Sequence, residues 1–530
     1  MGMNNKKPLL KRLIGVVSVT AGAFYMVGCG GGGNGADDFL TVSTQSGLVK
    51  GFYKDGTAGS AREFLGIPYA KPPLGELRFA PPQPVEPWSE PYQAMEFGAS
   101  CMQNVGALSA SGDVSEDCLT LNVYSPDGVN TSTLPVMVFI HGGAFISGGS
   151  NQYDGWRLAE QYGAVVVTLN YRLGALGFLS LPELDATLPA ADAGNAALED
   201  QRLALEWVQQ NIGSFGGDKD NVTLFGESAG SMSACVHMVS PGSQNLADKF
   251  IMESAVCVGG LPVNTKQQAT AVGTDLANAF CEGEADQLAC LRAVPAADLV
   301  AWGADAGIFG AGWSPTVISG SNMLPDAPIN LIESGQYNQG PIIVGTNVRE
   351  WGLFQLIGSG ETVATVDEFN AVIDATYPAQ LAPSVKQVYA PAADAVANLK
   401  LIEVLTDQLF RCPARTLARA TTAMGSEVWL YSFEQGAAYH AMELPYVFGN
   451  PSATLAPELN EPTREAIQSY WSAFAAGGNP NLDSQPEWPG FDAGSDQHMV
   501  LKEASEAASE LATATCDFWD DVAASQAAGQ

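Results

Sequence analysis

The stretch that most constrains this chain is residues 221–230, which read NVTLFGESAG and lead into a helix-prone run. A β-branched apolar segment that enters Gly-x-Ser-x-Gly and continues as a helix has the context of a nucleophile elbow. Gly226 and Gly230 allow a sharp turn, because a Cβ at either position would collide with the strand or the helix. The hydroxyl of Ser228 would then project above a sheet edge, and the amide of Ala229 at the helix N-terminus would point to a developing oxyanion.

Short β-rich runs alternate with helical segments such as Ala196–Ile212 along most of the chain. This alternation predicts an α/β fold, in which a mostly parallel central sheet is flanked by helices on both faces. Residues 260–340 and 355–425 are expected to be helical insertions over the carboxyl ends of the strands, where they shape the pocket. The predicted strands are Leu134–Ile140, Ala164–Asn170, Val222–Phe225, Phe250–Met252, Pro341–Gly345 and Val428–Phe433.

Composition limits the possible functions. Of the 530 residues, 46% are hydrophobic and 15% charged, which is typical of a globular protein with a large core. The net charge of −33 and the lack of a basic stripe argue against a nucleic-acid partner, and we favour solubility over attraction of cationic substrates as its role. No clustered His/Cys pattern suggests a metal, and no cofactor is expected. Residues 38–519 are expected to form the folded domain, and the Ala-rich, polar residues 520–530 to fray.

The N-terminus has the pattern of a signal peptide over residues 1–28. Four basic side chains precede the uncharged residues 13–27, a run shorter than the ~20 residues of a membrane-spanning helix. The end of this run, Met26-Val27-Gly28-Cys29, resembles a bacterial lipobox with Met where Leu is more usual. We therefore expect an exported protein anchored to the membrane through lipidated Cys29, with a Gly-rich tether over residues 29–37. The alternative is ordinary secretion with another cleavage site.

Eight further cysteines, an even number, indicate disulfides in an oxidising compartment, although the sequence does not fix their pairing. The simplest pairs bracket short loops, namely Cys101–Cys118 and Cys281–Cys290. A Cys412–Cys516 bond would close a loop of ~100 residues and stabilise the fold by about 4–5 kcal/mol in the chain-entropy model. Cys235 and Cys257 remain, and they either pair or stay buried as thiols.

A serine nucleophile needs a base, and the chain has four histidines. His237 lies nine residues beyond Ser228, about 900° around a helix, and so faces away from it. His141 precedes two glycines and fits a turn, whereas His498 lies in a short apolar run typical of a strand. His440 follows the last predicted strand in a loop, where a base can reach an elbow serine. Elimination therefore selects His440.

The base needs an acid, which lies between the serine and the histidine in the chain order of α/β-hydrolases. Glu350 follows the strongly β-prone run Pro341–Gly345 by a short loop, and we select it as the acid. An ion pair with Arg349 is the alternative role, but sequence neighbours face each other poorly. Glu253, also near a strand end, is the second choice.

The loop after the strand that ends at Ile140 reads His141-Gly142-Gly143-Ala144-Phe145. Its small residues let backbone amides approach a substrate carbonyl, and one such donor is typically worth ~10²- to 10³-fold in rate. The alternative is a glycine-rich turn that binds nothing, but the position after a strand favours an oxyanion hole.

These segments resemble those of type-B carboxylesterases, the α/β-hydrolase family that includes cholinesterases and bacterial para-nitrobenzyl esterases. The resemblance covers about residues 40–519, and its matching stretches are residues 64–70 (FLGIPYA), 116–123 (EDCLTLNV), 170–174 (NYRLG), 215–230 and 440–449 (HAMELPYVFG). It implies the α/β-hydrolase fold and the disulfides Cys101–Cys118 and Cys281–Cys290. The roles that it implies are Ser228 as nucleophile, Glu350 as acid, His440 as base, and the amides of Gly143, Ala144 and Ala229 as oxyanion hole.

Several positions depart from the family pattern. Ala144, Trp351 and Ala441 stand where glycine is common in the family. No tryptophan lies between Cys101 and Cys118, where cholinesterase-like members carry the ring that holds choline, so a choline ester is a poor candidate. Glu227 is expected to support the turn or a bound water.

The sequence thus predicts a serine carboxylic-ester hydrolase that forms an acyl-enzyme with small to medium, largely uncharged esters. Its activity should fall at acid pH as His440 becomes protonated, near the reference pKa of about 6.5. The alternative is a non-catalytic, cholinesterase-like surface recognition protein. Acyl length, alcohol size and oligomeric state are left open by the sequence.

Overall fold

The computed structural model describes residues 38–54, 61–104, 106, 109–129, 131–187, 193–302 and 317–528. The predicted signal peptide (1–28), Cys29 and the tether (29–37) lie outside the described residues. None of the helices within these ranges is both long enough and apolar enough to cross a membrane.

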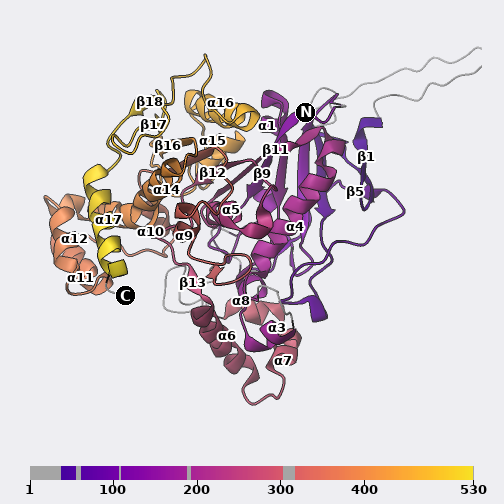
Figure 1. Ribbon diagram of the computed structural model, residues 1–530, viewed down its shortest axis with the longest axis horizontal. Coiled ribbons are helices and arrows are strands. Elements are labelled where there is room, and N and C mark those ends of the chain that lie inside the picture. Colours follow the sequence, from indigo (N-terminus) through magenta and orange to yellow (C-terminus); the bar gives the residue numbers. More distant parts are fainter. Residues whose placement is uncertain are drawn as a thin grey trace, which may run out of the picture. The chain divides into compact units, whose positions relative to one another are not determined.

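An eleven-stranded sheet forms the centre of the described structure (Figure 1). The neighbours from β10 to β17 pair in parallel, and the pairs at the two edges of the sheet are antiparallel. This arrangement confirms the predicted α/β fold. The strands, in order across the sheet, are β18 (Glu506–Ala508), β17 (His498–Leu501), β16 (Val428–Phe433), β15 (Ile342–Asn347), β12 (Lys249–Glu253), β11 (Gly217–Glu227), β9 (Leu134–Ile140), β10 (Val165–Leu169), β8 (Thr120–Pro126), β4 (Ala61–Pro68) and β3 (Phe52–Tyr53).

Strand β9 shows why the sheet needs cover on both faces. Successive strand side chains point to opposite faces, so Val136 and Val138 enter one core while Met137 and Phe139 enter another. The first core is closed by α2 (Gly174–Phe178), α4 (Ala196–Asn211), α5 (Ala229–Val239) and α14 (Cys412–Ala423), and the second by α1 (Trp156–Tyr162), α15 (Leu444–Phe448) and α16 (Glu461–Gly477).

Smaller elements complete the described chain. The further helices are α3 (Pro182–Thr187), α6 (Lys266–Cys281), α7 (Gln287–Ala293), α8 (Ala296–Ala301), α9 (Pro328–Glu333), α10 (Trp351–Leu356), α11 (Val366–Thr376), α12 (Ala382–Val388), α13 (Ala397–Thr406) and α17 (Thr513–Ala528). The further strands are β1 (Thr41–Thr44), β2 (Gly47–Lys50), β5 (Tyr92–Gln93), β6 (Ser100–Cys101), β7 (Val114–Ser115), β13 (Asn264–Thr265) and β14 (Ile318–Ser319). Most of these helices lie in the two predicted insertions.

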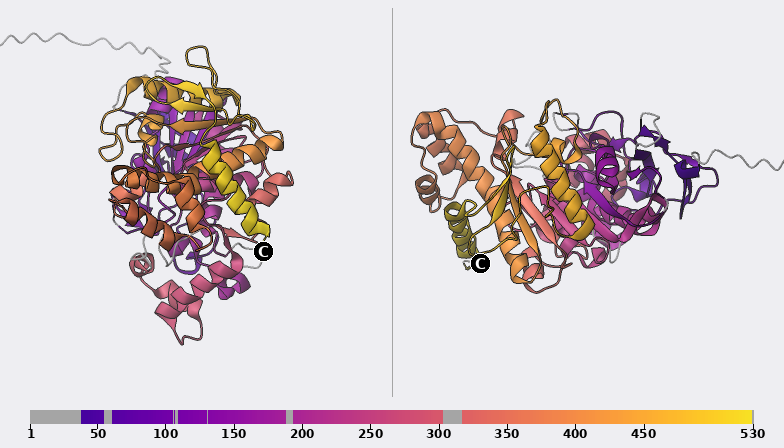
Figure 2. Two further views of the ribbon diagram at one scale, coloured as in Figure 1. Left: turned by 90° about the vertical axis from the view of Figure 1, so that its left-hand side faces the viewer. Right: turned by 90° about the horizontal axis from the view of Figure 1, so that it is seen from above.

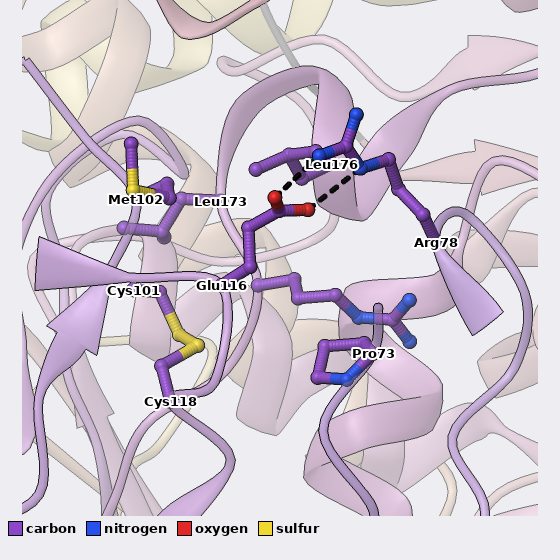
Figure 3. A pocket seen from close by; sticks show the side chains of 9 residues that line it. Pro73, Arg78, Cys101, Met102, Glu116, Cys118, Leu173 and Leu176 are labelled. Carbon is purple, nitrogen blue, oxygen red and sulfur yellow. Dashed lines mark hydrogen bonds and ion pairs between the residues drawn. A yellow bond between two sulfur atoms is a disulfide. The ribbon is translucent and has the colours of Figure 1, made fainter. Parts of the chain in front are cut away.

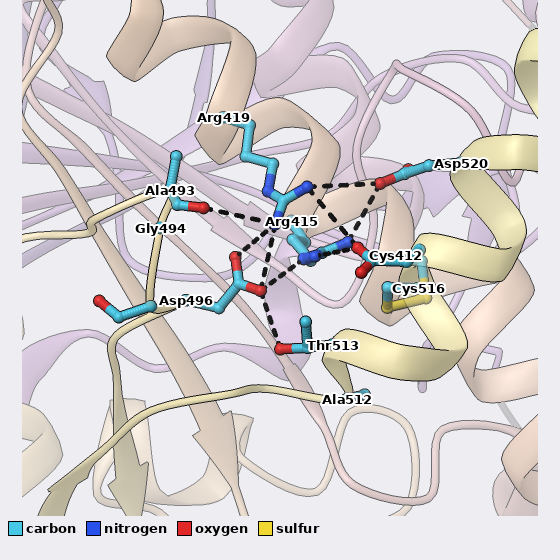
Figure 4. Close-up of polar contacts among 12 residues, drawn as sticks. Cys412, Arg415, Arg419, Ala493, Gly494, Asp496, Ala512, Thr513, Cys516 and Asp520 are labelled. Carbon is cyan, nitrogen blue, oxygen red and sulfur yellow. Dashed lines mark hydrogen bonds and ion pairs between the residues drawn. A yellow bond between two sulfur atoms is a disulfide. The ribbon is translucent and has the colours of Figure 1, made fainter.

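The C-terminal helix reaches into the segment that is predicted to fray. The sequence predicts fraying over residues 520–530, and the structure describes α17 as far as Ala528, beside α11 and α12 (Figures 1 and 2). Its apolar side packs with those helices, where Trp519 is 8% exposed. Its acidic side meets Arg415 of α14, which bonds both Asp517 and Asp520 (Figure 4). The Ala-rich composition concealed these anchoring contacts, because they come from segments about a hundred residues earlier.

Four disulfides join the eight cysteines. They are Cys101–Cys118, Cys235–Cys257, Cys281–Cys290 and Cys412–Cys516. The sequence left Cys235 and Cys257 open, and the structure pairs them between α5 and the loop after β12. Cys412–Cys516 ties α17 to α14 across a sequence separation of 104 residues.

Candidate active site

Ser228 lies at the sharp turn between β11 and α5. Its backbone has φ 56° and ψ −123°, a left-handed φ that few non-glycine residues adopt. The glycines on either side are required by space. A Cβ on Gly226 would lie 2.5 Å from the carbonyl group of Gly230, and a Cβ on Gly230 would lie 1.9 Å from the oxygen of Ile140. The motif therefore folds as the sequence predicts.

His440 and Glu350 meet at the carboxyl ends of β15 and β16, which are neighbours in the sheet. The Nδ1 atom of His440 lies 2.7 Å from Oε2 of Glu350, and both side chains are buried. The other carboxylate oxygen of Glu350 accepts the N–H of Asn347 at 2.6 Å. This contact directs Oε2 at the imidazole and favours a proton on Nδ1 of His440.

The alternative residues are engaged elsewhere. Glu253, the second choice for the acid, accepts the indole N–H of Trp471 at 2.6 Å. His237 is buried and bonds Ser243 and Gln201, as expected for a side chain that faces away from the serine. The two remaining histidines make local contacts: His141 stacks on Tyr171, and Nδ1 of His498 lies 3.1 Å from the carbonyl oxygen of Asp496.

Glu227 faces the imidazole from the other side, with Oε1 3.1 Å from Nε2 of His440. Burial raises the pKa of Glu227 to about 8 against the opposing effect of His440, and the nearby Glu443 and Glu350 add to the rise. Burial alone would lower the pKa of His440, but Glu227 and Glu350 together raise it to about 9. The expectation that Glu227 supports the turn or a bound water did not include this contact with His440.

Three backbone amides at the site have no acceptor among the described residues. They belong to Gly143, Ala144 and Ala229, the positions implied for the oxyanion hole. Gly143 and Ala144 have left-handed backbone, with φ of 105° and 53°. Phe145, with φ 60°, is the third left-handed residue in this run. Ala229 is the first residue of α5, whose leading N–H groups have no helical partner.

A cavity of about 150 Å³ brings these groups together. Ser228, His440 and Glu227 line it, and on one side it is bounded by Leu353 and Phe354 of α10. In the described structure the Ser228 hydroxyl and the imidazole share this cavity without a hydrogen bond between them. Such contacts often tighten only when substrate binds. The other lining residues are Gly142, Gly143, Ala144, Gly148, Gln152, Tyr153, Ala441, Ser452, Thr454 and Leu455.

The loop closed by Cys101–Cys118 supports one wall of the cavity. Gln103 donates to the carbonyl of Gly148 at 2.7 Å and accepts the N–H of Gly148 at 3.0 Å. At the other end of the loop, Glu116 forms a two-point ion pair with Arg78 (Figure 3). The disulfide and the ion pair together fix the loop from which Gln103 holds the wall.

Sequence reasoning missed several residues around His440. The rings of Phe354 and Phe410 each lie 5.1 Å from the imidazole of His440. Glu443 accepts from Ser254 at 3.0 Å and from the side chain of Asn347. Glu443 could have been found from its position three residues after His440, whereas Phe410 comes from a distant insertion without a local signal.

Comparison with known proteins agrees with this geometry. Residues 38–519 match the model of the carboxylesterase family. A para-nitrobenzyl esterase of Bacillus subtilis (strain 168) is 36% identical, with 87% of this chain and 94% of the relative covered. Carboxylesterase 1D of Rattus norvegicus is 34% identical, and the match covers 92% of this chain and 94% of the relative. An acylcarnitine hydrolase of Mus musculus is also 34% identical, and the match covers 90% of each chain. The chain therefore belongs to the carboxylesterase family and is a carboxylic-ester hydrolase.

Proposed function

We propose that this enzyme hydrolyses small to medium, largely uncharged esters through an acyl-enzyme on Ser228, with His440 as base and Glu350 as acid. The observation that carries the proposal is the buried 2.7 Å contact between His440 and Glu350 beside the cavity that Ser228 lines. A histidine held in this way takes a proton from a serine hydroxyl and later returns it to the leaving alcohol.

The reaction proceeds in two steps. The Ser228 oxygen attacks the ester carbonyl as His440 accepts its proton, and the resulting oxyanion is stabilised by the amides of Gly143, Ala144 and Ala229. The alcohol leaves with the proton from His440, and water then hydrolyses the acyl-enzyme by the same route. These steps use only side chains and backbone amides of the chain itself. Among the described residues, no group of three or more possible ligands could hold a metal ion.

The test is hydrolysis of p-nitrophenyl butyrate by Ser228→Ala. Loss of the nucleophile should lower kcat by about 10⁶-fold while the fold is retained, as in other triad enzymes. Ser231→Ala is the matched control, because this buried serine on the same helix bonds the carbonyl of Ala255 and does not line the cavity. Substantial turnover by Ser228→Ala would refute the assignment, and an inactive wild type would favour the recognition protein.

We also propose that the protein is exported and held at the membrane by a lipid on Cys29. Four disulfides support export, because such bonds persist in oxidising compartments. Expression of the full chain in bacteria with radiolabelled palmitate tests the anchor. Labelled wild type and unlabelled Cys29→Ser are expected, and equal labelling of both would contradict the proposal.

A further inference from the structure

A turn of π-helix lies in the second helical insertion, close to the proposed acid and base. It spans Asp407–Arg411 and joins α13, which ends at Thr406, directly to α14, which begins at Cys412. Single turns of this kind are rare and occur frequently at functional sites. The ring of Phe410 in this turn lies 5.1 Å from the imidazole of His440. The turn therefore faces the candidate active site, although none of its five described residues lines the cavity.

Two hydrogen bonds from this part of the insertion hold the loop that carries Glu350. Nη2 of Arg411 donates to the carbonyl oxygen of Val348 at 2.9 Å, two residues before Glu350. The hydroxyl oxygen of Thr406 accepts the N–H of Trp351 at 3.3 Å, one residue after Glu350. The loop is thus held on both sides of Glu350, where the chain has left β15 and α10 has not yet begun. Because the backbone of this loop determines where the Glu350 carboxylate lies, both contacts act on its position.

Arg411 is itself fixed by a chain of buried contacts that reaches the C-terminal helix. Its Nη1 atom forms an ion pair with one carboxylate oxygen of Asp407. Tyr389 donates to the other oxygen of Asp407 at 2.9 Å, and the indole N–H of Trp519 in α17 donates to Tyr389 at 2.8 Å. A guanidinium is a rigid planar fork, so a carboxylate on one arm and a carbonyl on the other fix its orientation. Arg411 is 7% exposed, which limits competition from water for these bonds.

We infer that Arg411 is a positioning residue for Glu350, which it holds through the backbone of Val348. This inference rests on the proposed function, in which Glu350 orients His440. Loss of the guanidinium removes one of the two anchors of the loop, so the carboxylate shifts relative to Nδ1 of His440. A displacement of about 1 Å at the reacting groups costs on the order of 10²-fold in rate. The alternative role of Arg411 is to attach the insertion to the sheet, which would affect stability alone.

The experiment measures p-nitrophenyl butyrate hydrolysis by Arg411→Met, alone and combined with Glu350→Ala. Alone, Arg411→Met should lower kcat by about 10²-fold. Its KM should not move, because Arg411 is not among the residues that line the cavity. In Glu350→Ala no carboxylate is left to position, so adding Arg411→Met should lower kcat by less than about threefold. Effects on kcat that multiply in full would show that the two residues act independently, which overturns the inference, as does wild-type kcat in Arg411→Met.

A second variant, Arg411→Lys, keeps the inference testable if Arg411→Met does not fold. Lysine retains a positive charge opposite Asp407, but its ammonium lacks the planar fork that also reaches Val348. Arg411→Lys should therefore keep the fold and still lower kcat, with the same dependence on Glu350 in the combined variant. Wild-type kcat in Arg411→Lys, or an equal loss of kcat with and without Glu350, would overturn the inference.

The matched control is Arg415→Met, which removes another buried arginine four residues later in the chain. Arg415 bonds aspartates near the C-terminus, so this variant should lose stability in urea without losing kcat. A loss of kcat in Arg415→Met as large as that in Arg411→Met would overturn the inference, because any damage to the insertion would then suffice. Failure of the proposed function is distinct from these results. It would appear as wild-type kcat in Glu350→Ala alone or as full activity in Ser228→Ala.

Discussion

Two carboxylate clusters in this molecule, one buried and one partly exposed, are compensated in different ways. At the candidate active site, three glutamates with at most 3% exposure act on the pKa of His440, namely Glu227, Glu350 and Glu443. Between α14 and α17, three aspartates meet two guanidinium groups (Figure 4). There Arg415, which is 1% exposed, lies 2.9 Å from Asp496 and 3.0 Å from Asp520.

The two clusters differ in the positive group that faces the carboxylates, and this group determines what each cluster can do. A guanidinium stays charged at any working pH, so the α14–α17 cluster is a fixed ion network that positions a helix. An imidazole changes its charge near neutral pH, and burial favours the protonated carboxylic acid. The pKa of Glu443 rises to about 7 and that of Glu227 to about 8, mainly through burial. The charges of the active-site cluster therefore depend on pH near neutrality, whereas those of the arginines do not.

The largest effect is expected when the acid at the active site is neutralised. Glu350→Gln keeps the shape of the side chain but removes the charge that holds the Nδ1–H tautomer of His440. We expect kcat to fall by about 10⁴-fold, the scale of this change in Ser-His-Asp enzymes. The measurement is p-nitrophenyl butyrate hydrolysis at constant pH. Glu253→Gln, equally buried but bonded to Trp471, is the control and should stay active. A loss below tenfold in Glu350→Gln would remove Glu350 from the mechanism.

The second largest effect is expected on stability, when an arginine of the α14–α17 cluster is replaced. Arg415→Met should lower the free energy of unfolding by about 3 kcal/mol, because it leaves Asp496, 2% exposed, with weaker compensation in a buried site. Urea denaturation with intact disulfides measures the change, and kcat should not move. Arg419→Met is the matched control. This residue contacts the same aspartate at 3.1 Å, but it is 32% exposed, and its loss should cost less than about 1 kcal/mol. Equal losses of unfolding free energy in Arg415→Met and Arg419→Met would show that the cost does not depend on how deeply the arginine is buried.

The sequence predicted most of the active-site framework because its signals are local. The predicted bounds of β9 and β16 are those of the structure, since both strands are mostly apolar runs with polar residues after them. The elbow followed from Gly226, Ser228 and Gly230. The sequence also proposed the partnership of His440 with Glu350, from strand ends and chain order, and the structure places a hydrogen bond between them.

The parts that could not be predicted depend on contacts between distant segments. β11 begins at Gly217, because the polar residues before Val222 join the strand through an irregular register beside β9. Glu227 looked like a turn residue, since its contact with His440 spans more than two hundred positions. The anchoring of α17 likewise needs Arg415, which no local pattern connects with the C-terminus.

A smaller effect is expected on the pH profile. Glu227→Gln removes the first of the charges that raise the pKa of His440 to about 9, so the imidazole should lose its proton at lower pH. The acid limb of kcat/KM, measured from pH 5 to 10, should move from about 9 toward the reference value of about 6.5. Glu253 is not among the charges that act on His440, so Glu253→Gln should leave the limb in place. If the acid limb of kcat/KM stays at the same pH in Glu227→Gln, Glu227 does not raise the pKa of His440.

The same variant should change the pH dependence of stability, with a sign that follows from the raised pKa. In the unfolded chain, glutamate loses its proton near pH 4.3, whereas folded Glu227 keeps its proton up to about pH 8. The native state therefore binds more protons than the unfolded state over this window, and the wild type should lose stability as pH rises from about 5 to 8. Glu227→Gln removes this contribution, so its stability should fall less steeply.

The smallest effect is expected at the solvent edge of the α14–α17 cluster. Asp520 lies 3.0 Å from Arg415, yet burial raises its pKa against the effect of that arginine, and 38% of its side chain remains exposed. Burial penalty and ion pairing thus oppose each other, and Asp520→Asn should change the free energy of unfolding by no more than about 0.5 kcal/mol. Urea denaturation beside Arg415→Met tests this. A loss of stability as large as that of Arg415→Met would show that each ion pair of the network contributes to the free energy of unfolding. The buried guanidinium of Arg415 would then not supply most of the stabilisation.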